Sequence, residues 1–227
     1  MAERLLLFGA SGHGRVVADA ARAAGWEIAG WADDDASRRG QELDGAPVVA
    51  TGVAEAAAWA RERGAHVVVS IGDNRARARL FEALLAAGAD LATVVHPAAV
   101  VSPSATLGSG TVVFAGAVIN PGTTIGRNVI VNTSVSVDHD NWIGDHAHLS
   151  PGVHLGGTVS VGEGAHLGVG VSVRNNLSIG AWTLVGVGAA VVADLPANVV
   201  AYGVPARVVR ESGCELESRS SAPHLSS

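Results

Sequence analysis

The sequence has 227 residues, a formal net charge of −6 and a single cysteine, Cys214. Its lysines and arginines are scattered and form no basic stripe, which argues against a nucleic-acid partner, and one cysteine cannot close an internal disulfide. No apolar stretch is long enough to cross a bilayer or to act as a signal-peptide core, so we expect a cytoplasmic protein without a membrane partner.

The first hundred residues alternate short β-rich segments with alanine-rich helical segments. The predicted strands cover residues 4–8, 27–32, 48–50, 66–71 and 91–95, and the predicted helices cover residues 15–24, 53–63 and 75–87. Alternation of this kind is typical of an α/β domain with a mostly parallel sheet. We therefore expect a Rossmann-like α/β domain over residues 1–96.

A glycine-rich turn, GASGHG over residues 9–14, connects the first predicted strand to the first helix. Free amides at a helix N-terminus stabilise a phosphate, and glycines let a ligand approach the backbone closely. The spacing is GxxGxG and differs from the GxGxxG of dinucleotide folds, which disfavours a nicotinamide cofactor. A phosphate-binding turn and a purely structural turn both stay open at this point.

Three consecutive aspartates, residues 33–35, follow the second predicted strand, and a Gly-Asp-Asn segment, residues 72–74, follows the fourth. Because ligands bind where the carboxyl ends of parallel strands meet, we expect both segments beside the glycine turn. A nucleotide sugar suits this edge: its pyrophosphate would lie over the glycine turn while Asp33 or Asp34 accepts a hydrogen bond from a base N–H. The residues predicted to bind this substrate are Gly12, His13, Gly14, Asp33, Asp34, Asp73 and Asn74.

Every sixth residue from Val101 to Val191 is aliphatic, at sixteen positions without an exception. A second column, four residues after each of these, holds small or aliphatic residues in nearly every case, and Asn141 is its polar exception. A period of six fits neither a helix nor a flat strand and indicates a short strand and a turn, repeated many times. We therefore expect a parallel β-helix over residues 97–210, followed by a disordered polar tail over residues 211–227.

Six motifs follow one another along the chain: LLLFGASGHG, a strand ending in Asp-Asp, SIGDN, HPAAVVSPSA, VDHDNWIGDHAHLSPG and YGVPARVV. Together they resemble the sialic-acid O-acetyltransferase and nucleotide-aminosugar N-acetyltransferase family. The closest type is the enzymes that act on nucleotide-linked 4-amino-4,6-dideoxysugars, such as perosamine N-acetyltransferases. The resemblance implies a left-handed β-helix and a homotrimer. It also implies that acetyl-CoA binds along the solenoid, that the aminosugar nucleotide binds to the N-terminal domain, and that no metal takes part.

The repeat also predicts which residues stack on one another. Three hexads form one triangular coil, so residues eighteen apart lie in one column at an inter-strand spacing of ~4.8 Å. His139 is then expected next to Gly157, at a corner of the triangle. An imidazole and a glycine N–H that face one volume supply a proton acceptor and an oxyanion donor, the pair that acyl transfer needs.

The resemblance assigns His139 as the general base and Asp140 as its orienting partner, although the family often carries the longer Glu at that position. Gly157 is expected to bind the oxyanion, and His148 to contact the acetyl donor or the sugar. The other residues expected to bind acetyl-CoA are Arg174, Tyr202, Pro205 and Arg207. Arginine pairs well with the phosphates of CoA.

Other functions stay open from the sequence alone. The same base serves an O-acetyltransferase that acts on sialic acid or another sugar hydroxyl. The column of His148 and His166, with His146 and His154 as further candidates, suggests a metal-dependent hydratase like the γ-carbonic anhydrases, although the spacing does not match that ligand set. His154 and His166 are otherwise expected on the surface. A non-catalytic trimeric scaffold is the remaining alternative, and the nucleotide is left open among UDP, GDP and dTDP.

Overall fold

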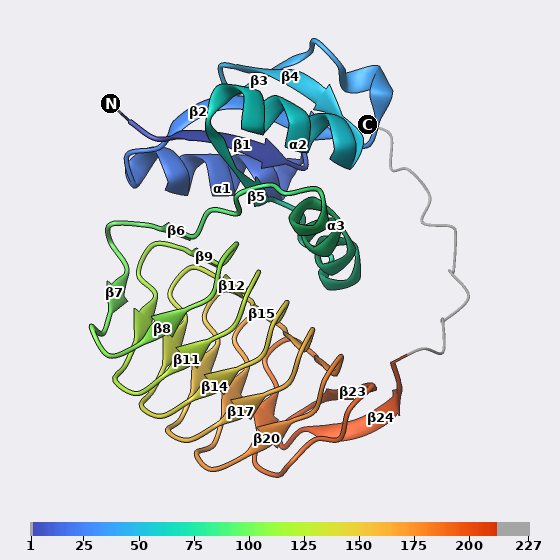
Figure 1. Ribbon diagram of the computed structural model, residues 1–227. Coiled ribbons are helices and arrows are strands. Elements are labelled where there is room, and N and C mark those ends of the chain that lie inside the picture. The colour runs from blue at the N-terminus through green and yellow to red at the C-terminus, as the bar shows by residue number, and fades with distance from the viewer. Residues whose placement is uncertain (1, 213–227) are drawn as a thin grey trace, which may run out of the picture.

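The computed structural model describes residues 2–212 and shows an α/β unit seated on one end of a triangular solenoid (Figure 1). The α/β unit contains a five-stranded sheet in the order β3-β4-β2-β1-β5, parallel except for the short β3. The strands are β1 (Arg4–Phe8), β2 (Glu27–Asp33), β3 (Glu42–Leu43), β4 (Ala46–Thr51) and β5 (Ala65–Val69). The helices are α1 (Gly12–Ala23), α2 (Gly52–Arg63) and α3 (Asn74–Ala86), with a 3₁₀ turn η1 (Ala36–Arg38).

The central strand β1 is apolar on both faces because both sides of the sheet are covered. Leu5 and Leu7 pack in one cluster with residues of α1, whereas Leu6 and Phe8 pack in another with residues of α2 and α3. All four are at most 1% exposed. The predicted Rossmann-like alternation is confirmed, and β3 is an addition that the sequence pattern did not reveal.

The predicted strand over residues 91–95 only begins at the edge of the α/β sheet and then leaves it. Leu91 makes an isolated bridge to Val67, and then β6 (Val94–Val95) pairs with β9 (Val112–Val113) of the solenoid. The expected pairing with the α/β sheet therefore holds at Leu91 and is wrong for Val94 and Val95. A short apolar run predicts a buried strand, but it does not show at which residue the strand stops pairing with one sheet and starts pairing with another.

The solenoid is a left-handed parallel β-helix, as the resemblance implied. Its core consists of the inward residues predicted from the period of six, and those from Val113 to Val191 are at most 5% exposed. Three sheets form its sides: sheet I (β7, β10, β13, β16, β19, β22), sheet II (β8, β11, β14, β17, β20) and sheet III (β6, β9, β12, β15, β18, β21, β23, β24). The remaining two-residue strands are β7 (Val100–Val101), β8 (Thr106–Leu107), β10 (Val118–Ile119), β11 (Thr124–Ile125), β12 (Ile130–Val131), β13 (Ser136–Val137), β14 (Trp142–Ile143), β15 (His148–Leu149), β16 (His154–Leu155), β17 (Ser160–Val161), β18 (His166–Leu167), β19 (Ser172–Val173), β20 (Ser178–Ile179), β21 (Leu184–Val185) and β22 (Ala190–Val191).

Two longer strands close the solenoid, β23 (Val199–Tyr202) and β24 (Arg207–Glu211), which pair antiparallel in sheet III. The polar tail was expected from residue 211, but Glu211 still belongs to β24. Residues 213–227 lie outside the described part of the chain. Among residues 2–212, no helix has the length and apolar character needed to cross a membrane.

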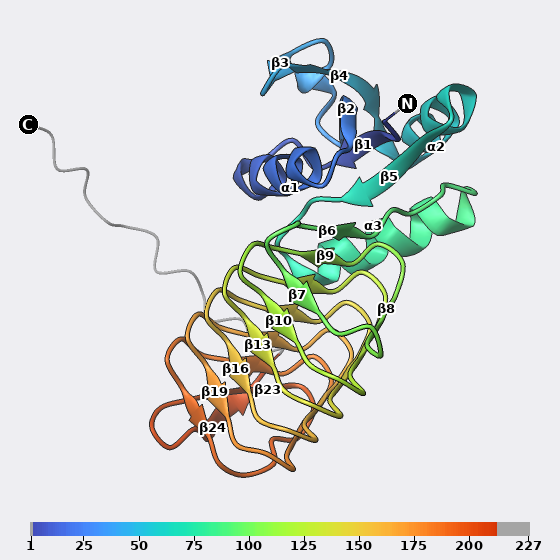
Figure 2. The ribbon, with the colours of Figure 1, turned by 90° about the vertical axis from the view of Figure 1, so that its left-hand side faces the viewer.

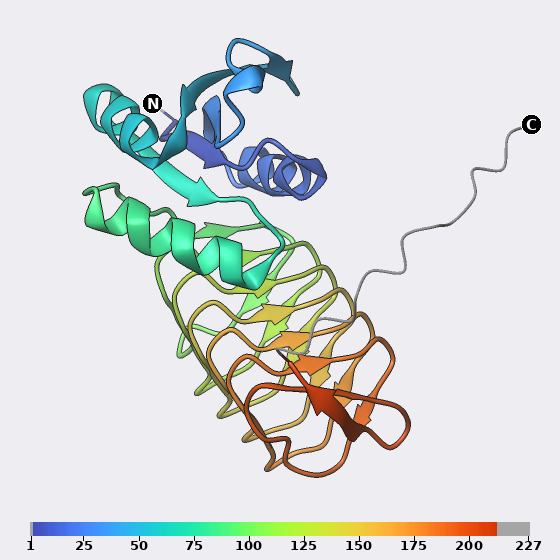
Figure 3. The ribbon, with the colours of Figure 1, turned by 90° about the vertical axis from the view of Figure 1, so that its right-hand side faces the viewer.

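The α/β unit is fixed to the outer face of sheet III, with α3 lying against the first coils (Figure 2 and Figure 3). Val112 and Ile130 point outward from sheet III and pack with the apolar cluster of β1 and α1. Arg77 of α3 is 1% exposed and donates hydrogen bonds to the carbonyl oxygens of Asn128 and His146, at 3.2 and 2.7 Å. Its burial lowers the pKa of Arg77 to about 9. The corner between sheets I and II therefore lies opposite the side that carries the α/β unit.

Candidate active site

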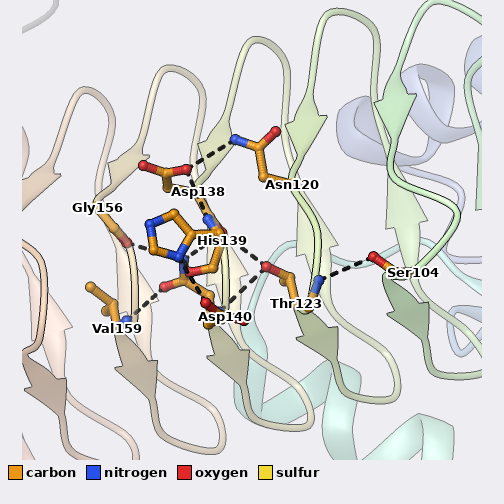
Figure 4. Close-up of polar contacts among 10 residues, drawn as sticks. Ser104, Asn120, Thr123, Asp138, His139, Asp140, Gly156 and Val159 are labelled. Atoms are coloured by element: carbon orange, nitrogen blue, oxygen red, sulfur yellow. Dashed lines mark hydrogen bonds and ion pairs between the residues drawn. The ribbon is translucent and has the colours of Figure 1, made fainter.

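The corner between sheets I and II carries the turn of residues 138–141, which joins β13 to β14 (Figure 4). Asp140 closes the turn with a left-handed φ of 57°. The His139 ring is 57% exposed, and its Nδ1 lies 2.8 Å from Asp140 Oδ2. The Asp140 hydrogen bond and the charge of Asp138 raise the pKa of His139. With Asp140 accepting from Nδ1, the neutral ring presents Nε2 as a proton acceptor.

The next coil brings Gly157 against this ring. A β carbon at position 157 would lie 2.6 Å from both Cε1 and Nε2 of His139, closer than van der Waals contact allows. The stacking is held by a hydrogen bond from Thr158 N to His139 O, at 2.9 Å. Within residues 2–212, the Gly157 N–H has no hydrogen-bond acceptor. The predicted column is therefore present, and a proton-accepting nitrogen and a free backbone N–H border the same space.

A second group of imidazoles lies where sheet III meets the α/β unit. His148 is 8% exposed and stacks on His166 with ring centroids 4.6 Å apart, while the His13 centroid lies 6.4 Å from that of His148. Burial lowers the pKa of His13 to about 4 and that of His148 to about 2, so both rings are neutral near pH 7. Neither His13 Nε2 nor His148 Nδ1 has a hydrogen bond of normal geometry among residues 2–212. Orphaned buried atoms are rare in native proteins, which makes this group of imidazoles a candidate binding site.

The aspartates meet the glycine turn at the carboxyl edge of the α/β sheet, as predicted. Asp33 Oδ2 accepts a hydrogen bond from Ala10 N at 2.9 Å, and its Oδ1 accepts one from Asp35 N at 3.0 Å. Both carboxylate oxygens of Asp33 thus hold the backbone of this edge. Asp34 is exposed beside it.

The two predicted substrate-binding glycines have different surroundings. A β carbon at Gly14 would lie 2.3 Å from Gly9 O, so the first turn of α1 packs directly against the end of β1. Gly12 has no neighbour within 4 Å of such a carbon. Gly14 is therefore required by packing, whereas the space beside Gly12 is open to a ligand.

The Gly-Asp-Asn segment starts α3 and reaches the solenoid. Asp73 caps the helix by accepting a hydrogen bond from Ala76 N at 2.7 Å. Asn74 is buried, and its amide donates to the carbonyl oxygens of Gly164 and Ala165, at 3.1 and 3.3 Å. The Asn74 side chain is thus committed to joining the two units. The sequence pattern did not reveal this contact because the bonded residues are far apart along the chain.

An open cleft of about 450 Å³ lies below the start of α3. Asp73, His166 and Leu184 contribute to its lining. Arg75 and Trp182 also line the cleft, and Arg75 Cζ lies 4.6 Å from the centroid of the Trp182 ring. His166 was expected on the surface but is partly buried here, and burial lowers its pKa. Among residues 2–212, no group of three or more His, Cys, Asp or Glu side chains is placed to hold a metal ion.

The residues expected to bind acetyl-CoA fall on two different edges of the solenoid. Arg174 is exposed on the edge of His139, two coils further along. Tyr202 ends β23 and is 55% exposed, while Pro205 is exposed in the segment that leads into β24 and Arg207 is exposed as the first residue of β24. That segment lies beside the turn joining β21 to β22, at the corner between sheets III and I.

Comparison with known proteins places the chain in a family. Residues 4–84 match the PglD N-terminal domain. The chain is also similar to PerB from Caulobacter crescentus, solved in complex with CoA and GDP-perosamine: the identity is 43% over 90% of this chain and 96% of that one, with a TM-score of 0.84. The chain belongs to the nucleotide-aminosugar N-acetyltransferase family.

Two further solved structures support the same family assignment. The acetyltransferase domain of PglB from Neisseria gonorrhoeae FA1090, in complex with acetyl coenzyme A, shares 34% identity over 92% of this chain and 100% of that one, with a TM-score of 0.82. A GDP-perosamine N-acetyltransferase from Caulobacter crescentus in which a histidine is replaced by alanine shares 43% identity over 91% and 97% of the two chains, with a TM-score of 0.85. A comparison with curated proteins found no match.

Proposed function

We propose that this enzyme transfers the acetyl group of acetyl-CoA to the 4-amino group of a nucleotide-linked 4-amino-4,6-dideoxysugar. The observation that carries the proposal is the juxtaposition of the exposed His139 ring and the unpaired Gly157 N–H. The substrate class is supported by PerB, whose structure contains CoA and GDP-perosamine. That likeness favours a GDP-linked sugar over UDP- and dTDP-linked ones.

In the proposed reaction the sugar amine attacks the thioester carbon, and the C–N bond forms as one N–H proton passes to His139 Nε2. The carbonyl oxygen becomes negative and accepts a hydrogen bond from the Gly157 N–H. The C–S bond then breaks, and the leaving thiolate takes the proton from the imidazolium, which releases CoA-SH. Asp140 holds Nδ1–H throughout and stabilises the charged ring.

The substrate pocket is proposed at the carboxyl edge of the α/β sheet. His13 lies in the glycine turn at this edge, with its ring centroid 6.4 Å from that of His148, and each neutral ring offers one donor and one acceptor for a phosphate or sugar oxygen. The open backbone at Gly12 and the start of α1 suit the pyrophosphate. Asp34 is a better candidate than Asp33 for a base N–H, since both Asp33 oxygens are already engaged.

A homotrimer is proposed because the two halves of the site lie on different sides of one chain. His139 is at the corner opposite sheet III, which carries the substrate-binding unit of its own chain. A neighbouring subunit would bring its sugar-binding pocket to this corner. It would also bring its segment from Tyr202 to Arg207 against Arg174, so that the two subunits enclose acetyl-CoA. The apolar Trp142 and Val187, 51% and 74% exposed, suit such a contact.

The first test is thiol release from acetyl-CoA by the purified enzyme with UDP-, GDP- and dTDP-linked 4-amino-4,6-dideoxysugars and with free sialic acid, followed by mass spectrometry. One added acetyl group on one aminosugar is the expected result. Turnover with sialic acid alone would replace the proposal with O-acetylation. A folded enzyme that is silent with every acceptor would overturn it and favour a hydratase or a scaffold.

The role of the base is tested by His139→Ala and His139→Asn. General-base catalysis contributes ~10²- to 10⁴-fold to the rate, so kcat should fall by that range while the KM for the sugar nucleotide stays nearly constant. Wild-type turnover in either variant would remove the base assignment.

A further inference from the structure

Asn141 is the one polar amide in a column of small and aliphatic residues, and it is 2% exposed at the end of the turn that carries His139. Its Nδ2 donates to the carbonyl oxygens of Asp138 at 2.6 Å and Gly156 at 3.0 Å, with His139 O at 3.3 Å. Its Oδ1 accepts a hydrogen bond from Val159 N at 3.0 Å. These contacts converge on the two turns that meet at the active corner, where Figure 4 shows Asp138 and His139 beside Gly156 and Val159.

Threonines elsewhere in the same column show what a purely structural residue does there. Thr111 Oγ1 donates to Gly126 O at 2.8 Å and accepts from Val129 N at 3.0 Å, which are the bonds that Asn141 makes to the following coil. A hydroxyl is therefore sufficient to join one coil to the next. Asn141 adds a reach back into its own turn, which a hydroxyl with one hydrogen cannot supply at the same time.

The bonds within its own turn and the bonds to the next coil together join the turn of His139 to the turn of Gly157. On one side they hold the carbonyls at 138 and 139, just before Asp140 adopts its left-handed φ. On the other side they hold Gly156 O and Val159 N, which flank Gly157. Because one buried amide is hydrogen-bonded to both turns, we expect a substitution of Asn141 to shift the His139 imidazole relative to the Gly157 N–H.

We propose that Asn141 is a positioning residue for acetyl transfer, which ties the His139 turn to the Gly157 turn and so sets the spacing between the base and the oxyanion-binding N–H. The inference rests on the function proposed above. Asn141 does not touch the reacting atoms; it acts through His139 and Gly157. Nothing in its place in the repeat requires an amide, since Thr111 and Thr183 occupy equivalent positions in other coils.

The test variant is Asn141→Thr, in which the hydroxyl keeps the bonds to Gly156 O and Val159 N as Thr111 does in its own coil. The carbonyls that lose the amide still have donors, because Thr123 Oγ1 bonds to Asp138 O and Thr158 N bonds to His139 O. We therefore expect a Tm close to that of the wild type. Thr111→Val is the matched control, since it removes the same inter-coil bonds at another corner and should lower Tm with kcat unchanged.

For Asn141→Thr we expect kcat to fall by ~10- to 100-fold, the cost of misplacing a reacting group by about 1 Å, with both KM values within about two-fold of wild type. The acidic limb of the kcat/KM profile should also move to lower pH, because a loosened turn weakens the effect of Asp140 and Asp138 on His139. Wild-type kcat and pH profile in this variant would overturn the inference. Should the threonine variant not purify, Asn141→Ser offers a hydroxyl with more room, and the same outcomes apply.

His139→Ala, measured in parallel, separates this inference from the proposed function. If His139→Ala is inactive and Asn141→Thr is fully active, only the positioning role is lost. If His139→Ala is fully active, the base assignment fails, and the positioning role fails with it.

Discussion

Replacing Gly157 by alanine should impair acetyl transfer without unfolding the solenoid. The new β carbon would lie 2.6 Å from Cε1 and Nε2 of His139. Since atoms in contact need about 3.5 Å, the ring has to move by roughly 0.9 Å. Misplacing a reacting group by about 1 Å costs up to ~100-fold in rate, so we expect kcat to fall by ~10- to 100-fold. Gly157 has no left-handed φ and Asn175 takes its place one coil on, so the backbone accepts a side chain and Tm should change little.

The assay is steady-state thiol release at saturating acetyl-CoA, combined with thermal unfolding. Gly170→Ala is the control, because Gly170 has open space around it but a φ of 69°. There the added carbon strains the backbone by ~1–2 kcal/mol, so Tm should fall while kcat is unchanged. Wild-type kcat in Gly157→Ala would refute the reasoning that the ring and the N–H share one volume.

Three further predictions concern ionisable side chains that are buried or paired. Arg77→Met leaves Asn128 O and His146 O without the guanidinium, so urea unfolding should show a loss of about 2 kcal/mol, partly offset because a costly buried charge is also removed. Asp140→Asn removes the main cause that raises the pKa of His139; the neutral base then persists to lower pH, and the acidic limb of kcat/KM should move down. His148 stays neutral in the fold with a pKa of about 2, whereas the unfolded chain binds a proton below about pH 6.5, so stability falls with pH below that value by ~1.4 kcal/mol per unit. His148→Gln should flatten this decline.

Each of these has a result that would contradict it. An unchanged urea midpoint in Arg77→Met would mean that the apolar contacts alone hold the two units together. An acidic limb that stays in place in Asp140→Asn would show that the carboxylate does not act on the base. A pH dependence of unfolding that is the same in His148→Gln as in the wild type would show that His148 is solvated in solution.

The repeat spacing predicted the inner side of the solenoid and the stacking of His139 with Gly157 because both depend on local spacing. An aliphatic residue every six positions defines the core, and its spacing places His139 eighteen residues before Gly157, one coil away. The glycine turn and the aspartates were predicted at one sheet edge for a similar reason, since parallel strands end together.

The outer side of the solenoid was not predictable in the same way. A two-residue strand shows which residue points inward but not what covers the residue that points outward. Three features depend on where the α/β unit docks on the solenoid. They are the burial of His148 and His166, the hydrogen bonds that Arg77 donates to the solenoid, and the change of pairing partner at β6. Those contacts join residues far apart along the chain, and no periodic pattern connects them.

Periods along one chain were therefore enough to predict the two kinds of fold, the inward core and the stacking of His139 with Gly157. Long-range packing had to be seen to learn which imidazoles are buried, that both Asp33 oxygens bond to the backbone, and that the Asn141 amide bonds to two turns. Burial and hydrogen-bond partners are set by whole helices and strands that pack together. The spacing of residues in one coil carries no information about the neighbour that covers it.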